Sequence, residues 1–137
     1  MHKQNTRTFI AAATTLGASA ALSTLPATAQ PVAPAKRLAH HVFFWLKNPA
    51  SVEDRDKLIE GIRTLSAIET VRGMHVGVVA STEKRDVVDN SWQVSELLFF
   101  DDLAGQSVYQ SHPVHLAFVK NYSHLWQKVV VFDAMEV

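Results

Sequence analysis

The chain has 137 residues, with 13 Lys and Arg, 13 Asp and Glu, and no cysteine. Basic and acidic residues balance and no long basic run occurs, which argues against nucleic acid as the main partner. Without cysteine there are no disulfides, so stability must come from packing within one small domain or across an oligomer interface.

The N-terminal segment 1–29 has the pattern of a cleavable export signal. Two cations precede a charge-free run over residues 9–25, and the sequence ATA at 27–29 supplies the small residues of a cleavage site before Gln30. The alternative is a transmembrane anchor, which is disfavoured because the run is short and poor in strongly apolar residues. We therefore expect an exported protein, periplasmic or secreted, with no membrane anchor in the mature chain.

A tether and a first strand are predicted next. Residues 30–37 hold two prolines and two cations without a hydrophobic period, which indicates a flexible tether. The folded domain is expected over 38–137, beginning with a strand at 38–47 that is dense in aromatic and branched residues. Because strand neighbours point to opposite faces, two sets of side chains are separated. One set is His40, Val42, Phe44 and Leu46, and the other is His41, Phe43 and Trp45.

A helix, a second strand and a loop follow. Ser51 with Asp54 resembles a capping box, and apolar residues at helical spacing predict an amphipathic helix over 52–68. The sequence GMHVGVVA predicts a strand at 73–80, and the polar residues 81–91 predict a loop.

Two further strands are predicted at 92–100 and 127–137. Alternation divides the side chains of each strand between its two faces. One face holds Trp92, Val94, Glu96, Leu98 and Phe100 in the third strand, and one face holds Val129, Val131, Asp133 and Met135 in the fourth.

Two helices are predicted between these strands. One of the aspartates at 101–102 caps a short helix. A second helix over 113–125 begins at Ser111 or His112, with Pro113 at its first helical position.

The resulting order is β-α-β-β-α-β, the ferredoxin-like arrangement of an α+β domain with a four-stranded antiparallel sheet. Helices are expected to cover one face of this sheet. The other face carries residues such as Phe43 and Trp45 and is too apolar to remain in water. A second sheet is the expected cover, so the sequence predicts a homodimer.

Three stretches carry a resemblance to a known family. They are HHVFFWLK in the first strand, SVYQSHPVHLAF across the two later helices, and WQKVVVFD in the last strand. With them, residues 38–136 resemble the stress-responsive dimeric α/β-barrel (Dabb) family. The resemblance implies the ferredoxin-like fold, with two sheets closing into a barrel across a dimer. It implies no single activity, since most members have none established and plant members are linked with stress tolerance.

One plant member of this family is a polyketide (olivetolic acid) cyclase, which performs an intramolecular aldol condensation. Similarity to it implies Tyr109 as a catalytic tyrosine and His115 as a catalytic histidine. It also implies His40 as a pocket histidine, or His41 if the register slips by one. Two positions depart from its pattern: a pocket histidine on the third strand is Val94 here, and a pocket tyrosine on the first helix has no counterpart.

The HPVH stretch leaves three interpretations open. His115 can transfer a proton near neutral pH, and Tyr109 can donate a hydrogen bond to a developing oxyanion. Alternatively, His112, Pro113 and His115 build the start of a helix. A metal site is the third interpretation, because the histidines lie one helical turn apart, but Pro113 between them and the absence of a recognised metal spacing disfavour it.

Four further residues are expected near the pocket: His40, Glu96, Trp126 and Asp133. Asp133 could orient His115. Glu96 stands on an apolar face, so its carboxyl group must pair with a first-strand histidine, reach water at the rim, or have a pKa raised by desolvation.

Three functions remain open from the sequence. The first is an exported homodimer that binds a small apolar ligand and has no established activity. The second is an enzyme that acts on a polyketide-like or other carbonyl compound through Tyr109 and His115, with no cofactor. The third is an interaction module that uses its sheet edge or its tether.

Overall fold

The computed structural model describes residues 36–137. The expected signal at 1–29 and most of the expected tether at 30–37 lie outside the described residues. The elements follow one another as β1 (Leu38–Leu46), α1 (Val52–Thr64), β2 (Gly73–Gly77), β3 (Val94–Phe100), α2 (Leu103–Ser111), α3 (Pro113–Tyr122) and β4 (Trp126–Met135). Short 3-10 turns at Leu65–Ala67 and Ser123–Leu125 continue α1 and α3. This order confirms the ferredoxin-like α+β fold.

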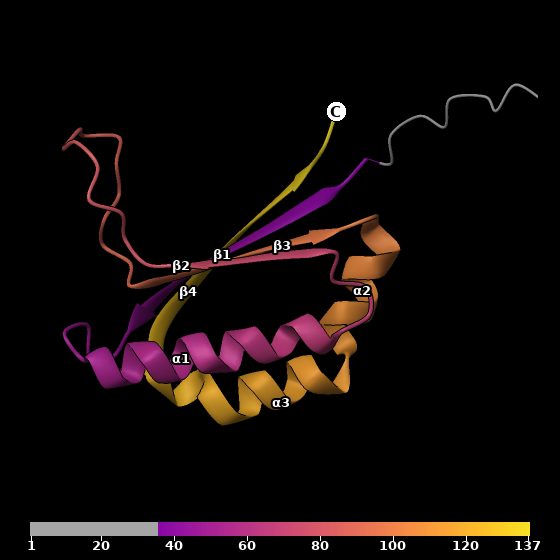
Figure 1. Ribbon diagram of the computed structural model, residues 1–137, viewed down its shortest axis with the longest axis horizontal. Helices are drawn as coiled ribbons and strands as arrows, with labels where there is room; N and C mark the ends of the chain where they lie inside the picture. The colour runs from indigo at the N-terminus through magenta and orange to yellow at the C-terminus, as the bar shows by residue number, and fades with distance from the viewer. Residues whose placement is uncertain (1–35) are drawn as a thin grey trace, which may run out of the picture. The chain divides into compact units, whose positions relative to one another are not determined.

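The four strands form one antiparallel sheet in the order β2-β3-β1-β4, and the helices lie on one side of it (Figure 1). In the central strand β1, Val42 stands opposite Glu96 of β3 and Val131 of β4. The same register places His40 directly opposite Asp133. The sheet therefore sets side by side two polar residues that are 93 positions apart in the chain.

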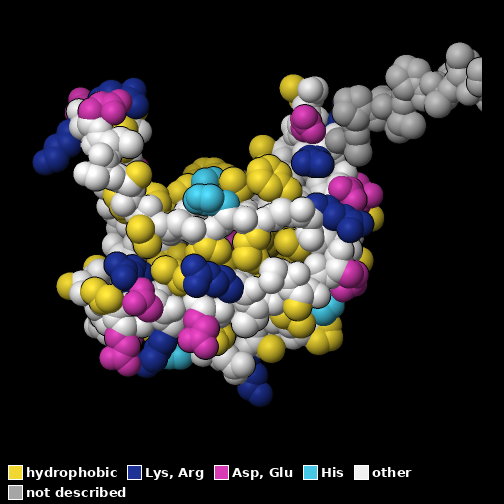
Figure 2. All heavy atoms as spheres, viewed as in Figure 1, with side chains coloured by type: hydrophobic (Ala, Val, Ile, Leu, Met, Phe, Trp, Pro, Cys, Tyr) yellow, Lys and Arg dark blue, Asp and Glu magenta, His cyan; other side chains and the backbone are white. Residues whose placement is uncertain are grey.

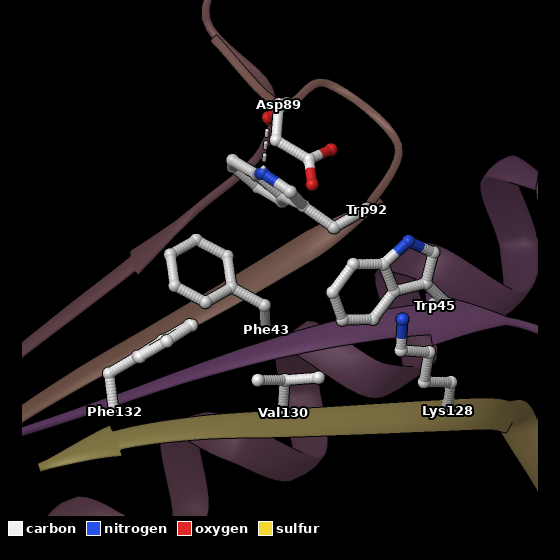
Figure 3. A pocket seen from close by; sticks show the side chains of 7 residues that line it. All are labelled: Phe43, Trp45, Asp89, Trp92, Lys128, Val130 and Phe132. Carbon is white, nitrogen blue, oxygen red and sulfur yellow. Dashed lines mark hydrogen bonds between the residues drawn. The ribbon is translucent and has the colours of Figure 1, made fainter. Parts of the chain in front are cut away.

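The other side of the sheet, which we call the open face, carries the aromatic side chains that alternation predicted there. Hydrophobic side chains gather on this side, away from the helices (Figure 2). Phe43 lies among Trp45, Trp92, Val130 and Phe132 (Figure 3). The segment between β2 and β3 rises from the sheet on this same side (Figure 1).

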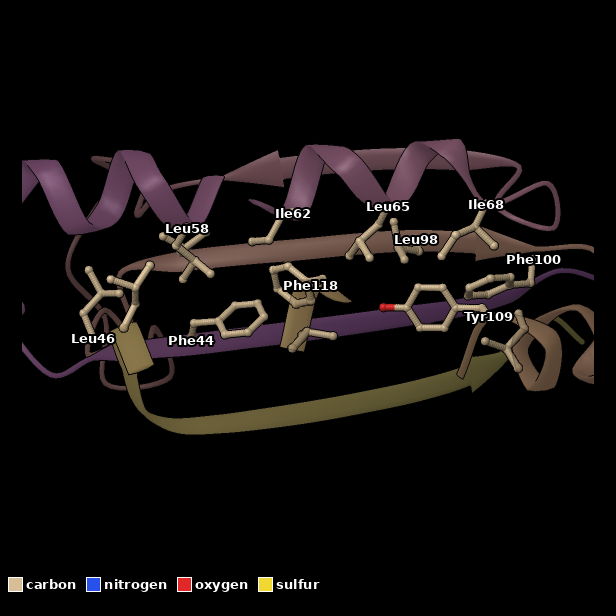
Figure 4. Packing of buried hydrophobic residues seen from close by; sticks show 14 residues of the cluster. Phe44, Leu46, Leu58, Ile62, Leu65, Ile68, Leu98, Phe100, Tyr109 and Phe118 are labelled. Atoms are coloured by element: carbon tan, nitrogen blue, oxygen red, sulfur yellow. The ribbon is translucent and has the colours of Figure 1, made fainter. Parts of the chain in front are cut away.

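The core fills the space between the helices and the sheet (Figure 4). Leu58 and Ile62 of α1 and Leu65 of the turn that continues it follow the predicted helical spacing and are fully buried, as is Leu98 of β3 beneath them. Burial of one such side chain contributes roughly 1.5 to 3 kcal/mol. This core fixes α1 on the sheet and leaves α2 and α3 to form the wall of a pocket.

Side-chain caps decide where the helices begin. The Ser51 hydroxyl accepts a hydrogen bond from the backbone N–H of Asp54, as the capping-box pattern predicts. Of the alternatives left open by the sequence, Asp102 caps α2 and His112 caps α3. Pro113 then occupies the first turn of α3, where its missing N–H costs nothing.

Several predicted boundaries differ from the structure, and two of these differences change which residues belong to a strand. β2 ends at Gly77 rather than residue 80, and β3 begins at Val94 rather than Trp92. Trp92 was expected on the face of Val94, but its indole N–H donates to the backbone oxygen of Asp89, which turns the side chain onto the open face. Within residues 36–137, no helix has the length and apolar character needed to cross a membrane.

Candidate active site

A pocket of about 370 Å³ lies between the helix side of the sheet and helices α2 and α3. Its lining includes five of the six predicted site residues: His40, Glu96, Tyr109, His115 and Trp126. Asp133, the sixth, does not line the pocket but bonds to His40. Most of the remaining wall is apolar and comes from Val42, Phe44, Phe118, Val119, Val129 and Val131.

The α2–α3 junction brings the two proposed catalytic residues together. Tyr109 lies in the last turns of α2 and is 2% exposed. The His112–Pro113 junction separates α2 from α3 and places His115 in the first turn of α3. The two rings then stand with centroids 4.6 Å apart. The ring of His40 approaches Tyr109 from the sheet, at 5.6 Å.

The hydrogen bonding of His115 determines its tautomer. Its Nδ1 lies 3.1 Å from the backbone oxygen of Gln110. Because a carbonyl oxygen can only accept, Nδ1 carries the hydrogen, and in the neutral ring Nε2 carries the lone pair. Nε2 has no hydrogen-bond partner within residues 36–137. Burial lowers the pKa of His115, the bond to Gln110 opposes this, and His40 adds to it, so the neutral base predominates at neutral pH.

Tyr109 and Glu96 form a buried hydrogen-bonded pair. The Tyr109 hydroxyl donates to Oε1 of Glu96 at 3.2 Å, and Glu96 is 1% exposed. Burial raises the pKa of Glu96 to about 7, although the bond from Tyr109 favours the ionised form. Burial and the nearby Glu96 carboxylate raise the pKa of Tyr109 above its usual range, so the phenol remains a donor. This pair supplies the acidic side of the pocket.

His40 and Asp133 form a second pair. Nδ1 of His40 lies 2.6 Å from Oδ1 of Asp133 and donates a hydrogen bond to the carboxylate. The other ring nitrogen, Nε2, takes no part in this bond. The side chain of His40 is nearly buried, whereas that of Asp133 is half exposed. An exposed carboxylate therefore holds the orientation of a buried imidazole.

Two possible pairings are not found. Asp133 could have oriented His115, but the β1–β4 register places it opposite His40. Of the three possibilities for Glu96, neither the pairing with a first-strand histidine nor a position in water at the rim holds, because Glu96 is 1% exposed and bonds to Tyr109. The third possibility, a pKa raised by desolvation, is the one that applies. The choice between the adjacent histidines is also decided, because His40 faces this pocket and its neighbour lies on the open face.

His112 has the structural role that the helix-start interpretation describes. Its Nδ1 accepts from the backbone N–H of Val114 at 3.1 Å. Nε2 must then carry the hydrogen, and it lies 3.2 Å from Oε2 of Glu69. In the part of the chain that the structure describes, no three His, Cys, Asp or Glu side chains group as a metal site.

Sequence reasoning missed part of a second hollow, about 550 Å³ in volume, on the open face. Asp89, Trp92 and Lys128 join the predicted aromatic residues there (Figure 3). The Lys128 ammonium lies 4.4 Å from the ring centroid of Trp45, a cation–π contact. Strand alternation from Val130 and Phe132 could have placed Lys128 on the open face. No sequence pattern indicated that the side chain of Trp92 would turn to the same face.

Comparisons with known proteins give the family and the fold. No curated protein matches this chain. A Dabb family protein from Mesorhizobium loti is similar in structure, with 23% identity and a TM-score of 0.61 over 74% of this chain and 98% of that one. A dimeric ferredoxin-like protein of unknown function from Thermobifida fusca has 15% identity and a TM-score of 0.61 over 77% and 95% of the respective chains.

A hydroxynitrile lyase from Passiflora edulis has 20% identity and a TM-score of 0.63 over 76% of this chain and 96% of that one. These likenesses show a shared fold. The family model of the stress responsive A/B barrel domain matches residues 38–136. The chain therefore belongs to the stress responsive A/B barrel (Dabb) domain family.

Proposed function

We propose that the helix-side pocket binds a small, largely apolar molecule that carries a carbonyl oxygen. Apolar side chains from β1, β4 and α3 form most of the wall and supply the affinity for the hydrocarbon part. Tyr109 and the two histidines are the polar groups that would orient an oxygen atom. The convergence of Tyr109 and His115 on one pocket is the observation that carries this proposal.

We further propose that the bound molecule undergoes cofactor-independent proton transfer. The specific observation is the lone pair on Nε2 of His115. The bond from Nδ1 to Gln110 fixes this tautomer, and burial favours the neutral ring. A base beside a phenol donor can remove a proton next to a carbonyl group while the phenol stabilises the oxygen on which charge develops. Because the mechanism needs only proton transfers, it suits enolisation, aldol-type condensation and related carbonyl chemistry.

The binding proposal can be tested with 2-tetralone, an apolar ketone that has acidic hydrogens beside its carbonyl group. Binding is followed through the indole N–H signals in a two-dimensional NMR spectrum, and proton transfer through deuterium uptake at the α-carbon in D₂O. His115→Ala and Tyr109→Phe are compared with His124→Ala and Tyr122→Phe, which alter the same residue types outside this pocket lining. We expect exchange to fall only in the first pair.

Equal binding and equal exchange in wild type and all four variants would remove Tyr109 and His115 from the chemistry. Because one structural neighbour is a hydroxynitrile lyase, a hydroxynitrile belongs in the same screen as a second probe. Binding of either probe without any proton transfer would support a ligand carrier rather than an enzyme.

We propose that the protein is a homodimer in which the open faces of two sheets cover each other. Phe132 is 61% exposed, and its ring lies 6.0 Å from that of Phe43 in a connected aromatic cluster. Such a surface favours burial against a complementary one, and a second copy provides an identical apolar face. Light scattering at micromolar concentration should give twice the chain mass, and a clean monomer would contradict the proposal.

We propose export on the basis of the signal pattern at 1–29. The measurement is mass spectrometry of the protein recovered from a bacterial host that has a periplasm. We expect a chain that begins at Gln30 in the periplasmic fraction. A full-length chain confined to the cytoplasm would contradict this proposal and leave the pocket proposals unaffected.

A further inference from the structure

Glu96 is a buried carboxyl group to which the proposed chemistry gives no role. It lies in the middle of β3, opposite Val42 on one side and Val76 on the other, so both strand neighbours are apolar. One carboxylate oxygen bonds to the Tyr109 hydroxyl at 3.2 Å. A carboxyl group kept at 1% exposure among apolar side chains needs a reason, because burial of its ionised form is costly.

Few other titratable groups face Glu96. His40 reaches the pocket from β1 and His115 from α3, while the carboxylate of Asp133 is already bonded to His40. The buried residues of α1, Leu58, Gly61 and Ile62, contribute no charge. No Lys or Arg lines the pocket. Glu96 therefore has no cationic side chain to hold it ionised, and Tyr109 is its hydrogen-bond donor.

The protonation state of Glu96 determines where the Tyr109 hydrogen points. An ionised carboxylate only accepts, so the phenol hydrogen is committed to Glu96. A protonated carboxyl group can donate its own hydrogen to the phenol oxygen, which releases the phenol hydrogen toward the pocket. The raised pKa of Glu96, about 7, makes both states accessible near neutral pH.

We propose that Glu96 is a positioning residue that holds a proton and thereby directs the Tyr109 hydroxyl onto the oxygen of the bound molecule. The inference rests on the proposed function, because it assumes that an oxygen atom of the ligand lies within reach of Tyr109. It identifies Glu96 as the residue that controls the Tyr109 donor. It also gives the pH range in which this donor is available to the ligand.

The proton transfers balance without any further reactant. The C–H bond next to the carbonyl group breaks, its proton goes to Nε2 of His115, and its electron pair moves to the carbonyl oxygen. That oxygen takes the hydroxyl proton of Tyr109, and the phenol oxygen takes the carboxyl proton of Glu96. The pocket is left with an imidazolium and a carboxylate, and reversal of these transfers restores both groups.

The first test uses the protein without ligand. Glutamate labelled with ¹³C at the carboxyl carbon is titrated by NMR in wild type, Tyr109→Phe and Glu96→Gln, and the signal missing in Glu96→Gln identifies Glu96. We expect its midpoint near pH 7, well above those of the exposed glutamates. In Tyr109→Phe the midpoint should rise further, because the bond from Tyr109 favours the ionised form. A midpoint in the range of the exposed glutamates, or one unchanged by Tyr109→Phe, would overturn the inference.

The second test measures deuterium uptake by 2-tetralone across pH. In wild type the rate should fall about 50-fold between pH 7 and pH 9 as Glu96 loses its proton. Glu96→Gln keeps a neutral N–H donor beside Tyr109 at every pH, so its rate should change less than about threefold over the same range. A merely structural glutamate would lower the rate at all pH values and leave the profile of the variant parallel to wild type, which would overturn the inference.

The two tests separate the inference from the proposed function. If 2-tetralone is neither bound nor exchanged by wild type at any pH, the proposed function fails for this ketone, and the ligand-free titration still decides the state of Glu96. If exchange occurs but Glu96 titrates like an exposed carboxyl group, the proposed function stands and the inference fails.

Discussion

The two faces of the sheet are built from alternate residues of the same strands, yet they differ in how their polar groups are satisfied. On the helix side, each proposed site residue with a titratable side chain is tied to a partner within the chain, as His40 is to Asp133 and Tyr109 to Glu96. On the open face, rings mainly contact other rings. The ring centroid of Phe43 lies 4.2 Å from that of His41 and 5.1 Å from that of Trp92.

The two faces also differ in what covers them. One chain supplies both apolar walls and polar groups to the pocket, from the sheet, α2 and α3. The open face has an aromatic surface but no covering element among the described residues. We therefore assign chemistry to the helix side and association to the open face, and the four predictions below test this division.

The largest effect is expected for His115→Ala. Loss of a positioned general base lowers a rate by about 100- to 10,000-fold, so deuterium uptake by 2-tetralone should fall by that order. The matched control is His124→Ala, which removes an exposed histidine near the end of α3 and should leave the rate unchanged. Equal losses in both variants would break the assignment of chemistry to the pocket.

The next effect concerns Glu96 and the pH dependence of stability. Between its ordinary pKa of 4.5 and about 7, the folded protein keeps a proton that the unfolded chain has lost. The free energy of unfolding therefore decreases as pH rises through this window, by about 3 kcal/mol, and the loss is complete above pH 7. The lowered pKa values of His41 and His115 act in the opposite direction below pH 6.5.

Glu96→Gln removes the first contribution and leaves the second. Urea unfolding at pH 5 and pH 8, at one fixed protein concentration, should show a drop in stability for wild type that is absent or reversed in the variant. Parallel behaviour of the two proteins would contradict a buried carboxyl group on the helix side.

A smaller effect is expected on the open face for Phe43→Asp. A charge at the centre of an apolar interface should cost about 2 kcal/mol or more, which weakens the dimer about 30-fold or more. Leu116→Asp is the control, because Leu116 is 56% exposed on α3 and lies outside the open face. Sedimentation across a dilution series should show dissociation only in Phe43→Asp. Dissociation of both variants, or of neither, would break the assignment of association to the open face.

The smallest effect is expected for His112→Ala, which tests the boundary between structure and chemistry inside the HPVH stretch. Loss of the cap on α3 should lower the free energy of unfolding by about 1 kcal/mol, and His112→Asn should restore most of it. Deuterium uptake should change less than about twofold. A large loss of exchange in a folded His112→Ala protein would move His112 into the chemistry.

Patterns along the chain predicted the fold well. Strand alternation separated His40 from His41, and helical spacing found the buried stripe of α1. For the caps of α2 and α3, the sequence left only two adjacent residues as candidates. This is possible because a capping hydrogen bond, such as that from Gly105 N–H to Asp102, joins residues a few positions apart. Such features depend on neighbours within a few residues, which the sequence shows directly.

The pairings inside the site could not be predicted, because they depend on contacts between distant elements. Asp133 bonds to His40 through the register of two strands, and Glu96 bonds to Tyr109 through the way α2 docks on the sheet. The partner of His115 is a backbone oxygen of Gln110, and a carbonyl group has no signature in the sequence. The family resemblance and strand alternation therefore indicated most of the side chains that enter the pocket, Asp133 excepted, but not how they pair.

The chain's three tryptophans report on the two faces separately. Trp126 lines the helix-side pocket, whereas Trp45 and Trp92 line the hollow on the open face. The most direct test of the division is one pair of two-dimensional NMR spectra of the protein, recorded with and without 2-tetralone. We expect the indole N–H signal of Trp126 to move and those of Trp45 and Trp92 to remain in place. Movement of Trp45 and Trp92 with Trp126 unchanged would contradict it.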